Sequence, residues 1–213
     1  SRDGDGQHRA GAVYVLNLNT DGTVKHTQKI SAMYGMADGV ANPFSKGGTY
    51  ALEEEDRFGY SVGFIGDIDG NGVPDIVIGS DGDDDGNTGG HDAGKKMAHG
   101  AVFVVFLNQK GRAKKIQKIS SIFGGLEAST IHAGDGFGQS ANGIGDIDGD
   151  GFEDVLVGAK KSDSNGNDSG GAYLYYGPLS GVYATAHGNL SGPSESAEAG
   201  VSMAGIGDIN ADS

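Results

Sequence analysis

Phe58-Gly-Tyr-Ser-Val-Gly-Phe-Ile-Gly-Asp-Ile-Asp69 is the stretch that decides the fold, because the chain repeats it. It returns as Phe-Gly-Gln-Ser-Ala-Asn-Gly-Ile-Gly-Asp-Ile-Asp at 137–148 and as Ala-Gly-Val-Ser-Met-Ala-Gly-Ile-Gly-Asp-Ile-Asn at 199–210. Self-similarity with a unit of about 60 residues is typical of proteins built from stacked repeats. The repeat therefore constrains the architecture before residue propensities are considered.

A second block recurs between these copies and supplies the remaining strands. Gly11-Ala-Val-Tyr-Val-Leu-Asn-Leu-Asn returns at 100–108 and, more loosely, as Gly-Ala-Tyr-Leu-Tyr-Tyr at 171–176. Short runs rich in Val, Ile, Phe and Tyr and bounded by turn residues favour strands. The predicted strands are 12–18, 24–30, 60–65, 75–79, 101–107, 113–119, 154–158 and 172–176. No segment has a helical stripe, so we expect an all-β fold of four-stranded antiparallel β-propeller blades.

The strand count also predicts the organisation of the chain. Residues 1–57 hold the end of one blade and an insertion, 58–136 and 137–198 each form a blade with an acidic loop, and 199–213 start the next. Propellers close with four to eight blades, so we expect an incomplete propeller whose further blades come from the parent chain or another subunit. The start at Ser1, without a signal-like segment, is interpreted as that of a piece of a longer protein.

The same count separates two faces of the disc. The acidic loops and the tight turn at 108–111 are predicted on one face, and the long insertions on the other. These insertions span 31–57, 80–99, 121–136 and 159–170. We expect a protein or glycan partner to bind the face that carries them.

The acidic loops carry the chemistry. Asp-Ile-Asp-Gly-Asn-Gly-Val-Pro-Asp at 67–75 returns as Asp-Ile-Asp-Gly-Asp-Gly-Phe-Glu-Asp at 146–154. Side-chain oxygens at positions one, three, five and nine, with the carbonyl of position seven, form a cage of hard ligands that suits calcium. The predicted ligands are Asp67, Asp69, Asn71, Val73 and Asp75 in the first loop and Asp146, Asp148, Asp150, Phe152 and Asp154 in the second. An EF-hand is excluded because position twelve is Ile78 or Val157 instead of glutamate.

At these residues the chain resembles the FG-GAP repeats, the blades of integrin α-subunit propellers. Phe58-Gly59 and Phe137-Gly138 match the Phe-Gly of the family, and Gly79-Ser80 and Gly158-Ala159 stand where Gly-Ala-Pro is expected. The resemblance implies a propeller, calcium in the acidic loops and a role in adhesion or extracellular assembly. The third copy departs from the pattern, with Ala211 in place of a glycine, so we expect weak or no binding there. Its candidate ligands are Asp208, Asn210 and Asp212.

Composition excludes several classes of partner. The formal charge of −14 argues against nucleic acid and anionic membranes, which would repel the chain, and favours cations. The longest apolar run, 102–107, is far shorter than the roughly 20 residues of a membrane-spanning helix, so we expect no membrane segment in this stretch. There is no cysteine, so neither a disulfide framework nor a thiolate metal site can form.

Weaker features have ordinary explanations. An acidic group in the 80–99 insertion comprises Asp81, Asp83, Asp84, Asp85 and Asp92, and its spacing favours a solvated loop over a second cation site. The runs 53–56 and Asp163 with Asp168 are interpreted in the same way. Asn167 and Asn189 lie in glycosylation sequons, which matter only in a secreted eukaryotic protein. The histidines show no metalloprotease spacing and each acidic pair is explained by the repeat, so we expect no enzyme.

These observations predict a calcium-binding, non-catalytic propeller module for adhesion or for protein or glycan binding. Extracellular calcium modules bind at about 10⁻⁴ to 10⁻³ M, which indicates an extracellular or cell-surface address, or a periplasmic one in a bacterium. One alternative is an architectural subunit of an extracellular fibre, appendage or surface assembly. A minor alternative is a propeller domain attached to a hydrolase.

Overall fold

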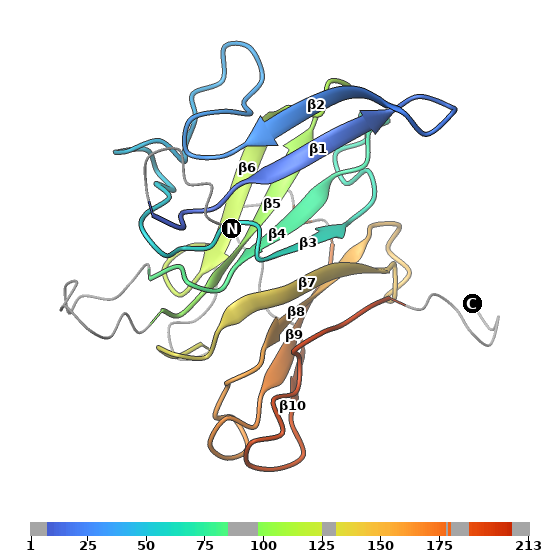
Figure 1. Cartoon of the computed structure of the whole chain (residues 1–213). Helices are drawn as coiled ribbons and strands as arrows, with labels where there is room; N and C mark the ends of the chain where they lie inside the picture. Colours follow the sequence, from blue (N-terminus) through green and yellow to red (C-terminus); the bar gives the residue numbers. More distant parts are fainter. Residues whose placement is uncertain (1–7, 85–97, 125–130, 178, 180–187, 206–213) are drawn as a thin grey trace.

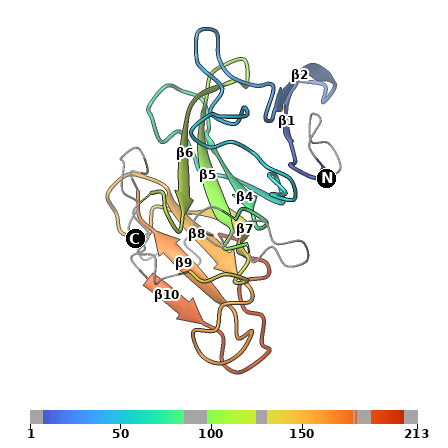
Figure 2. The same ribbon diagram turned by 90° about the vertical axis from the view of Figure 1, so that its left-hand side faces the viewer.

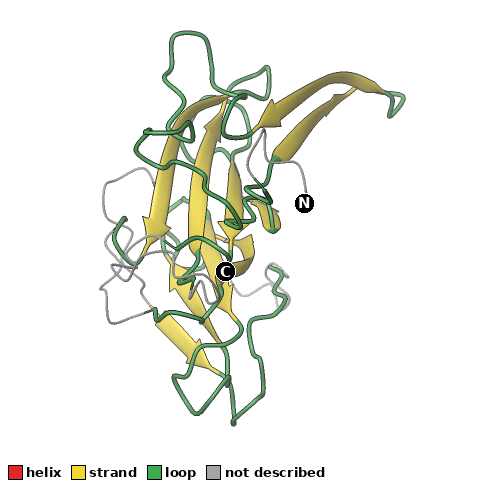
Figure 3. Cartoon of the chain, turned by 60° about the vertical axis from the view of Figure 1, so that its left-hand side comes forward, coloured by secondary structure: helices red, strands yellow, loops and turns green. Residues whose placement is uncertain are grey.

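The computed structural model describes residues 8–84, 98–124, 131–177, 179 and 188–205. Every regular element in this part of the chain is a β-strand (Figure 3). The predicted all-β fold of four-stranded antiparallel blades is confirmed, and the blades do not close into a ring (Figure 1).

Three antiparallel sheets follow one another along the chain, and each is a simple meander. The first pairs β1 (Val13–Leu18) with β2 (Val24–Ile30). The second contains β3 (Ser61–Phe64), β4 (Ile76–Ser80), β5 (Ala101–Leu107) and β6 (Ala113–Ser120). The third contains β7 (Phe137–Gly145), β8 (Asp154–Ala159), β9 (Gly171–Tyr175) and β10 (Gly188–Ser191).

All eight predicted runs contain a strand, whereas β7 and β10 were not among them. The sequence of β7, Phe-Gly-Gln-Ser-Ala-Asn-Gly-Ile-Gly, holds few of the β-branched and aromatic residues that mark a strand. It becomes a strand because it pairs with β8, so the neighbouring strand overrides its low propensity.

The three sheets follow one another in space (Figures 1 and 2). One hydrophobic core lies between the first and second sheets and another between the second and third. Alternate residues of β5 enter different cores, as the two-residue period of a strand requires. Phe103, Val105 and Leu107 belong to the core shared with β1 and β2, whereas Val102 and Val104 belong to the core shared with the third sheet. All of β5 is therefore buried, because a sheet covers each of its faces.

The junction between successive sheets repeats along the chain. Isolated parallel bridges join Gly11 to Phe58, Gly100 to Phe137, and Gly170 to Ala199. Each bridge links the start of a third strand to the Phe-Gly position of the following unit. The repeat register of the last copy therefore runs through Gly170, and the alignment of Gly171 with Gly100 is wrong by one residue.

Hydrogen bonds and close main-chain contacts lie beside two of these bridges. The hydroxyl of Ser61 donates to the carbonyl oxygen of Gly138 at 2.9 Å, and the hydroxyl of Ser140 donates to that of Gly200 at 2.7 Å. A Cβ atom on Gly79 would overlap the same Gly138 oxygen. Only glycine leaves room at this position for the next unit to approach.

The insertion 31–57 belongs in part to the core. The Phe44 ring lies 4.8 Å from that of Phe58 and 5.4 Å from that of Phe103, and Leu52 is buried beside them. The turns after β1, β3 and β7 lie together at the right of Figure 1, and the 31–57 insertion lies at its left and top. The 31–57 insertion therefore lies away from the two acidic loops, and the placement of all four insertions on one face stays a prediction.

Candidate metal centres in the acidic loops

The first acidic loop connects β3 to β4 and gathers three carboxylates. Oxygen atoms of Asp67, Asp69 and Asp75 all lie within 4.8 Å of one another. Asp67 is fixed by the main chain, because its Oδ1 accepts the N–H of Asn71 at 3.0 Å and its Oδ2 accepts that of Gly72 at 2.7 Å. The loop wraps tightly enough for these bonds because Gly70 and Gly72 adopt φ values of 73° and 81°.

Asp75 anchors the loop to the sheet. Its Oδ2 accepts the N–H of Ile68 at 3.2 Å, and its Oδ1 accepts the N–H of Leu107, at the end of β5, at 2.8 Å. The side chain is fully buried, and this burial raises the pKa of Asp75 to about 6 despite the two hydrogen bonds. Asp75 thus serves the fold as well as the carboxylate cluster.

The second acidic loop connects β7 to β8 and repeats this pattern. Oxygen atoms of Asp146, Asp148 and Asp150 lie within 4.8 Å of one another, and all three residues are exposed. Asp146 accepts the N–H groups of Gly149, Asp150 and Gly151 at 2.8, 3.0 and 2.7 Å. Partial desolvation, followed by the charges of its neighbouring aspartates, raises the pKa of Asp148. An added cation would relieve that repulsion.

Asp154 occupies the position in this loop that Asp75 occupies in the first. It accepts the N–H of Ile147 at 2.7 Å and the N–H of Gly177, just after β9, at 2.9 Å. It lies outside the group formed by the other three aspartates. The two loops therefore share their backbone anchoring but gather different sets of carboxylates.

The donor set fits a hard divalent cation. Oxygen ligands from several carboxylates in a glycine-rich loop are what calcium prefers. The Asn71 amide lies beside these carboxylates. Its Nδ2 donates to Asp69 and, at 3.1 Å, to the Leu107 carbonyl oxygen. The carbonyl roles of Val73 and Phe152 stay predictions.

Comparison with known proteins agrees with this geometry. The FG-GAP repeat family model matches residues 134–175, which include the second loop. Integrin alpha-6 of Homo sapiens is 34% identical over 127 residues, or 59% of this chain, and integrin alpha-5 of Xenopus laevis is 34% identical over 110 residues, or 51%. Residues 134–175 thus match an FG-GAP repeat, and about half of the chain is similar to integrin α subunits. Integrin alpha pat-2 of Caenorhabditis briggsae is 37% identical over 109 residues, or 50% of the chain. These matches cover only 7 to 9% of the length of the three relatives.

The remaining site predictions have different outcomes. Asp208, Asn210 and Asp212, like Asp85 and Asp92, lie outside the described residues. Asn167 is exposed in the loop before β9, and Asn189 lies on β10 opposite Tyr173. Within the described ranges there is no helix that could cross a membrane.

The predicted solvation of 53–56 and 80–85 is wrong for three aspartates. Asp56, Asp81 and Asp83 are all buried. Lys118 Nζ lies 2.6 Å from Asp83 Oδ2 and is itself buried, so the pair neutralises charge inside the second blade. Lys118 belongs to a Gln-Lys-Ile-Ser segment that repeats residues 28–31, but that repeat does not show that its charge would be buried. Asp135, which stands two residues before Phe137 as Asp56 stands before Phe58, is buried too, and both accept the N–H of the residue three positions earlier, so the burial of Asp56 repeats along the chain.

Asp56 should make stability depend on pH. Burial, followed by the charge of Asp83, raises its pKa to about 8, although the Glu53 N–H and Lys118 act in the opposite direction and Asp84 adds to the rise. The unfolded value is about 3.9, so the folded state binds the proton more tightly. Stability from this group is complete below pH 4 and is lost as pH rises toward 8.

We therefore expect the free energy of unfolding to fall between pH 5 and pH 7 by up to about 1.4 kcal/mol per pH unit through Asp56. Urea unfolding in the presence of a chelator measures this slope, and Asp56→Asn should flatten it. The difference between the two profiles isolates Asp56 from the loop aspartates. Equal slopes in both proteins would contradict the assignment.

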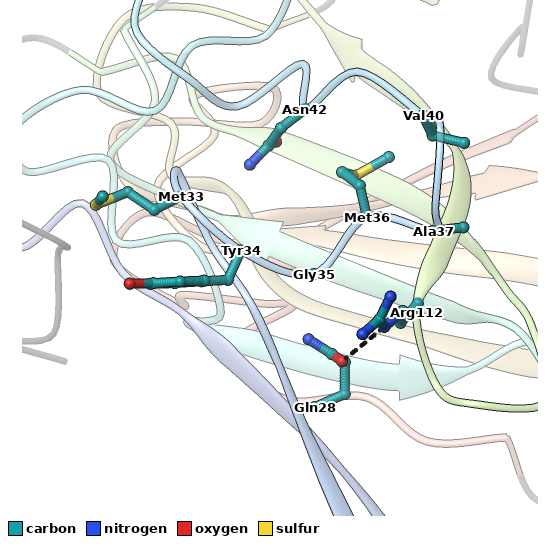
Figure 4. Close-up of a pocket in the computed structure, with 9 residues that line it drawn as sticks. All are labelled: Gln28, Met33, Tyr34, Gly35, Met36, Ala37, Val40, Asn42 and Arg112. Carbon is teal, nitrogen blue, oxygen red and sulfur yellow. Dashed lines mark hydrogen bonds between the residues drawn. The ribbon is translucent and has the colours of Figure 1, made fainter.

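A cleft of about 330 Å³ opens between the 31–42 segment and β2 (Figure 4). Met33, Met36 and Val40 contribute apolar side chains to its lining, and Gln28, Asn42 and Arg112 contribute polar ones. The Arg112 guanidinium donates to Gln28 at 3.2 Å and to Asp38 at 2.6 Å. No sequence motif predicted this cleft, because its walls come from an insertion outside the repeat.

Proposed function

We propose that this chain is a calcium-binding, non-catalytic module of an extracellular or cell-surface protein, acting in adhesion or in protein or glycan binding. The observation that carries the proposal is that two equivalent loops each gather three aspartates. In each loop, carboxylate oxygens of the three lie within 4.8 Å of one another. Integrin α similarity over half the chain supports a role in adhesion. Binding at about 10⁻⁴ to 10⁻³ M, as in extracellular modules, would leave the sites empty at submicromolar cytosolic calcium.

Calcium has a clear physical task in these loops. Carboxylates at about 4 to 5 Å repel one another by roughly 3 to 4 kcal/mol per pair at an effective dielectric near 20. A divalent cation converts this repulsion into attraction and holds each loop against its sheet. Bound calcium would then stabilise the face that carries the acidic loops. We place the partner on the opposite face, which carries the insertions.

Thermal unfolding tests the proposal. At ten times the dissociation constant each site contributes about 1.4 kcal/mol, so two sites should raise the midpoint by about 6 to 11 °C in a chain of this size. The double variant Asp69→Ala with Asp148→Ala should lose this response. The control, Asp38→Ala with Asp163→Ala, removes two exposed carboxylates outside the loops and should keep it. If neither calcium nor chelator changed the unfolding midpoint of the wild type, the proposal would be refuted.

A second candidate, an architectural subunit, is favoured by one face of the first sheet. Tyr14 and Leu16 on β1 are 52% and 53% exposed. Their repeat equivalents, Phe103 and Val105, are buried against a preceding sheet. Another blade, from the parent chain or another subunit, would cover this face. Sedimentation analysis distinguishes the candidates, since a stable monomer that binds a soluble partner excludes the fibre.

A further inference from the structure

The first acidic loop already holds a cation supplied by the protein. Lys114 Nζ lies 2.5 Å from Asp69 Oδ2. The Lys114 and Asp69 side chains are only 35% and 19% exposed. Burial raises the pKa of Asp69, but hydrogen bonds from Lys114 and Asn71 more than offset it and lower the pKa. The ammonium group thus neutralises a carboxylate that calcium would also use.

A bulge in β6 positions this lysine. Phe106 pairs with Lys115 and Leu107 pairs with Ala113, so Lys114 is the extra residue between them. Ala113 is held from the other side, where its N–H donates to the Gly35 carbonyl and its carbonyl accepts the Ala37 N–H, both at 2.8 Å. The 31–57 insertion therefore fixes the residue next to Lys114.

The second acidic loop has no such partner in the part of the chain that the structure describes. No ion pair there involves Asp146, Asp148 or Asp150. The sequence from 178 to 190, which follows β9 as the 108–119 segment follows β5, contains neither lysine nor arginine. Among the described residues, the two loops thus differ by one positive charge beside the carboxylates.

We propose that Lys114 is a tethered competitor for calcium, which holds the first loop together without metal and weakens its calcium affinity relative to the second. The inference rests on the proposed calcium-binding function. Calcium can enter the first loop only if the ammonium group leaves Asp69 or remains near a divalent charge of the same sign, and both cost free energy. The second loop fills first as calcium rises.

Calorimetric titration with calcium chloride tests this in a background where Asp146→Asn and Asp148→Asn disable the second loop. Lys114→Gln should tighten binding about three- to tenfold. Lys114→Arg, which keeps the charge, should bind as the background does. Lys115→Gln is the matched control: it removes the same charge one residue away, where the ammonium group lies over the Phe106 ring at 4.8 Å. It should change affinity less than about twofold.

Thermal unfolding gives an independent readout. In chelator, Lys114→Gln should unfold at a lower temperature than the background, because the carboxylates lose their internal cation. In saturating calcium the order should reverse. Equal affinities in the background and Lys114→Gln, with calcium bound in both, would overturn the role of Lys114 alone. Absence of calcium binding in both would overturn the proposed function of this loop and the inference with it.

Discussion

Gly79→Ala is expected to lower the free energy of unfolding by about 3 kcal/mol, the upper range for overpacking a tight contact. The new methyl group would overlap the carbonyl oxygen of Gly138 and lie against the Ser61 hydroxyl. Both belong to the junction between the second and third sheets, so the sheets would have to separate. For a chain of this size the midpoint should fall by about 6 to 12 °C.

Gly188→Ala is the matched control for this prediction. Gly188 also lies in a strand, and a Cβ atom there would meet only Leu174 at ordinary van der Waals distance. Its substitution should change stability by less than about 0.5 kcal/mol. Gly158→Ala should behave like Gly79→Ala, because it meets Gly200 in the same way. Wild-type stability in Gly79→Ala would show that the junction is loose.

Asp75→Ala should destabilise the chain by about 2 to 4 kcal/mol even when calcium is absent. The substitution leaves the buried N–H groups of Ile68 and Leu107 without acceptors, and each such loss costs about 1 to 3 kcal/mol. Relief of repulsion from Asp67 and Asp69 offsets part of that cost. Urea unfolding in excess chelator measures the effect without a contribution from metal binding.

Asp69→Ala separates anchoring from metal binding. Asp69 contacts Lys114 and Asn71 and, unlike Asp75, accepts no buried N–H of the sheet among the described residues, so its loss in chelator should cost less than about 1 kcal/mol. Asp75→Asn, which keeps one acceptor oxygen, should fall between Asp75→Ala and wild type. If Asp75→Ala matches wild type in chelator, then Asp75 serves only the metal site.

The repeat made much of this molecule predictable. Alternation and turn residues located the strands of the two sheets richest in Val and Ile, and the spacing of Asp67 and Asp146 located both acidic loops. Local sequence suffices there, because the loop bonds of Asp67 and Asp146 reach no further than five residues along the chain. The same spacing could not show that Asp154 lies apart from its group.

What remained hidden depends on contacts between distant segments. Lys114 meets Asp69 across 45 positions of sequence through a bulge that no pattern marks. Glu55 and Arg57 adopt left-handed φ values of 71° and 58°, where the next copy has Gly134 and Gly136. One copy keeps the glycine signature of this turn and the other has replaced it with charged residues. The burial of Asp56 recurs at Asp135, its equivalent in the next unit, but the acidic run at 53–56 hid it in the sequence.

The junctions between sheets have a consequence for how such a chain can evolve. Beside the hydrophobic cores, the contacts at the bridges are made from carbonyl oxygens, glycines and a serine hydroxyl, so this part of each junction places few demands on the other side chains of either unit. A duplicated unit would make the same main-chain contacts with its neighbour, whatever loops it carries. The architecture can therefore lengthen by copying and diversify by insertion, without the two processes interfering.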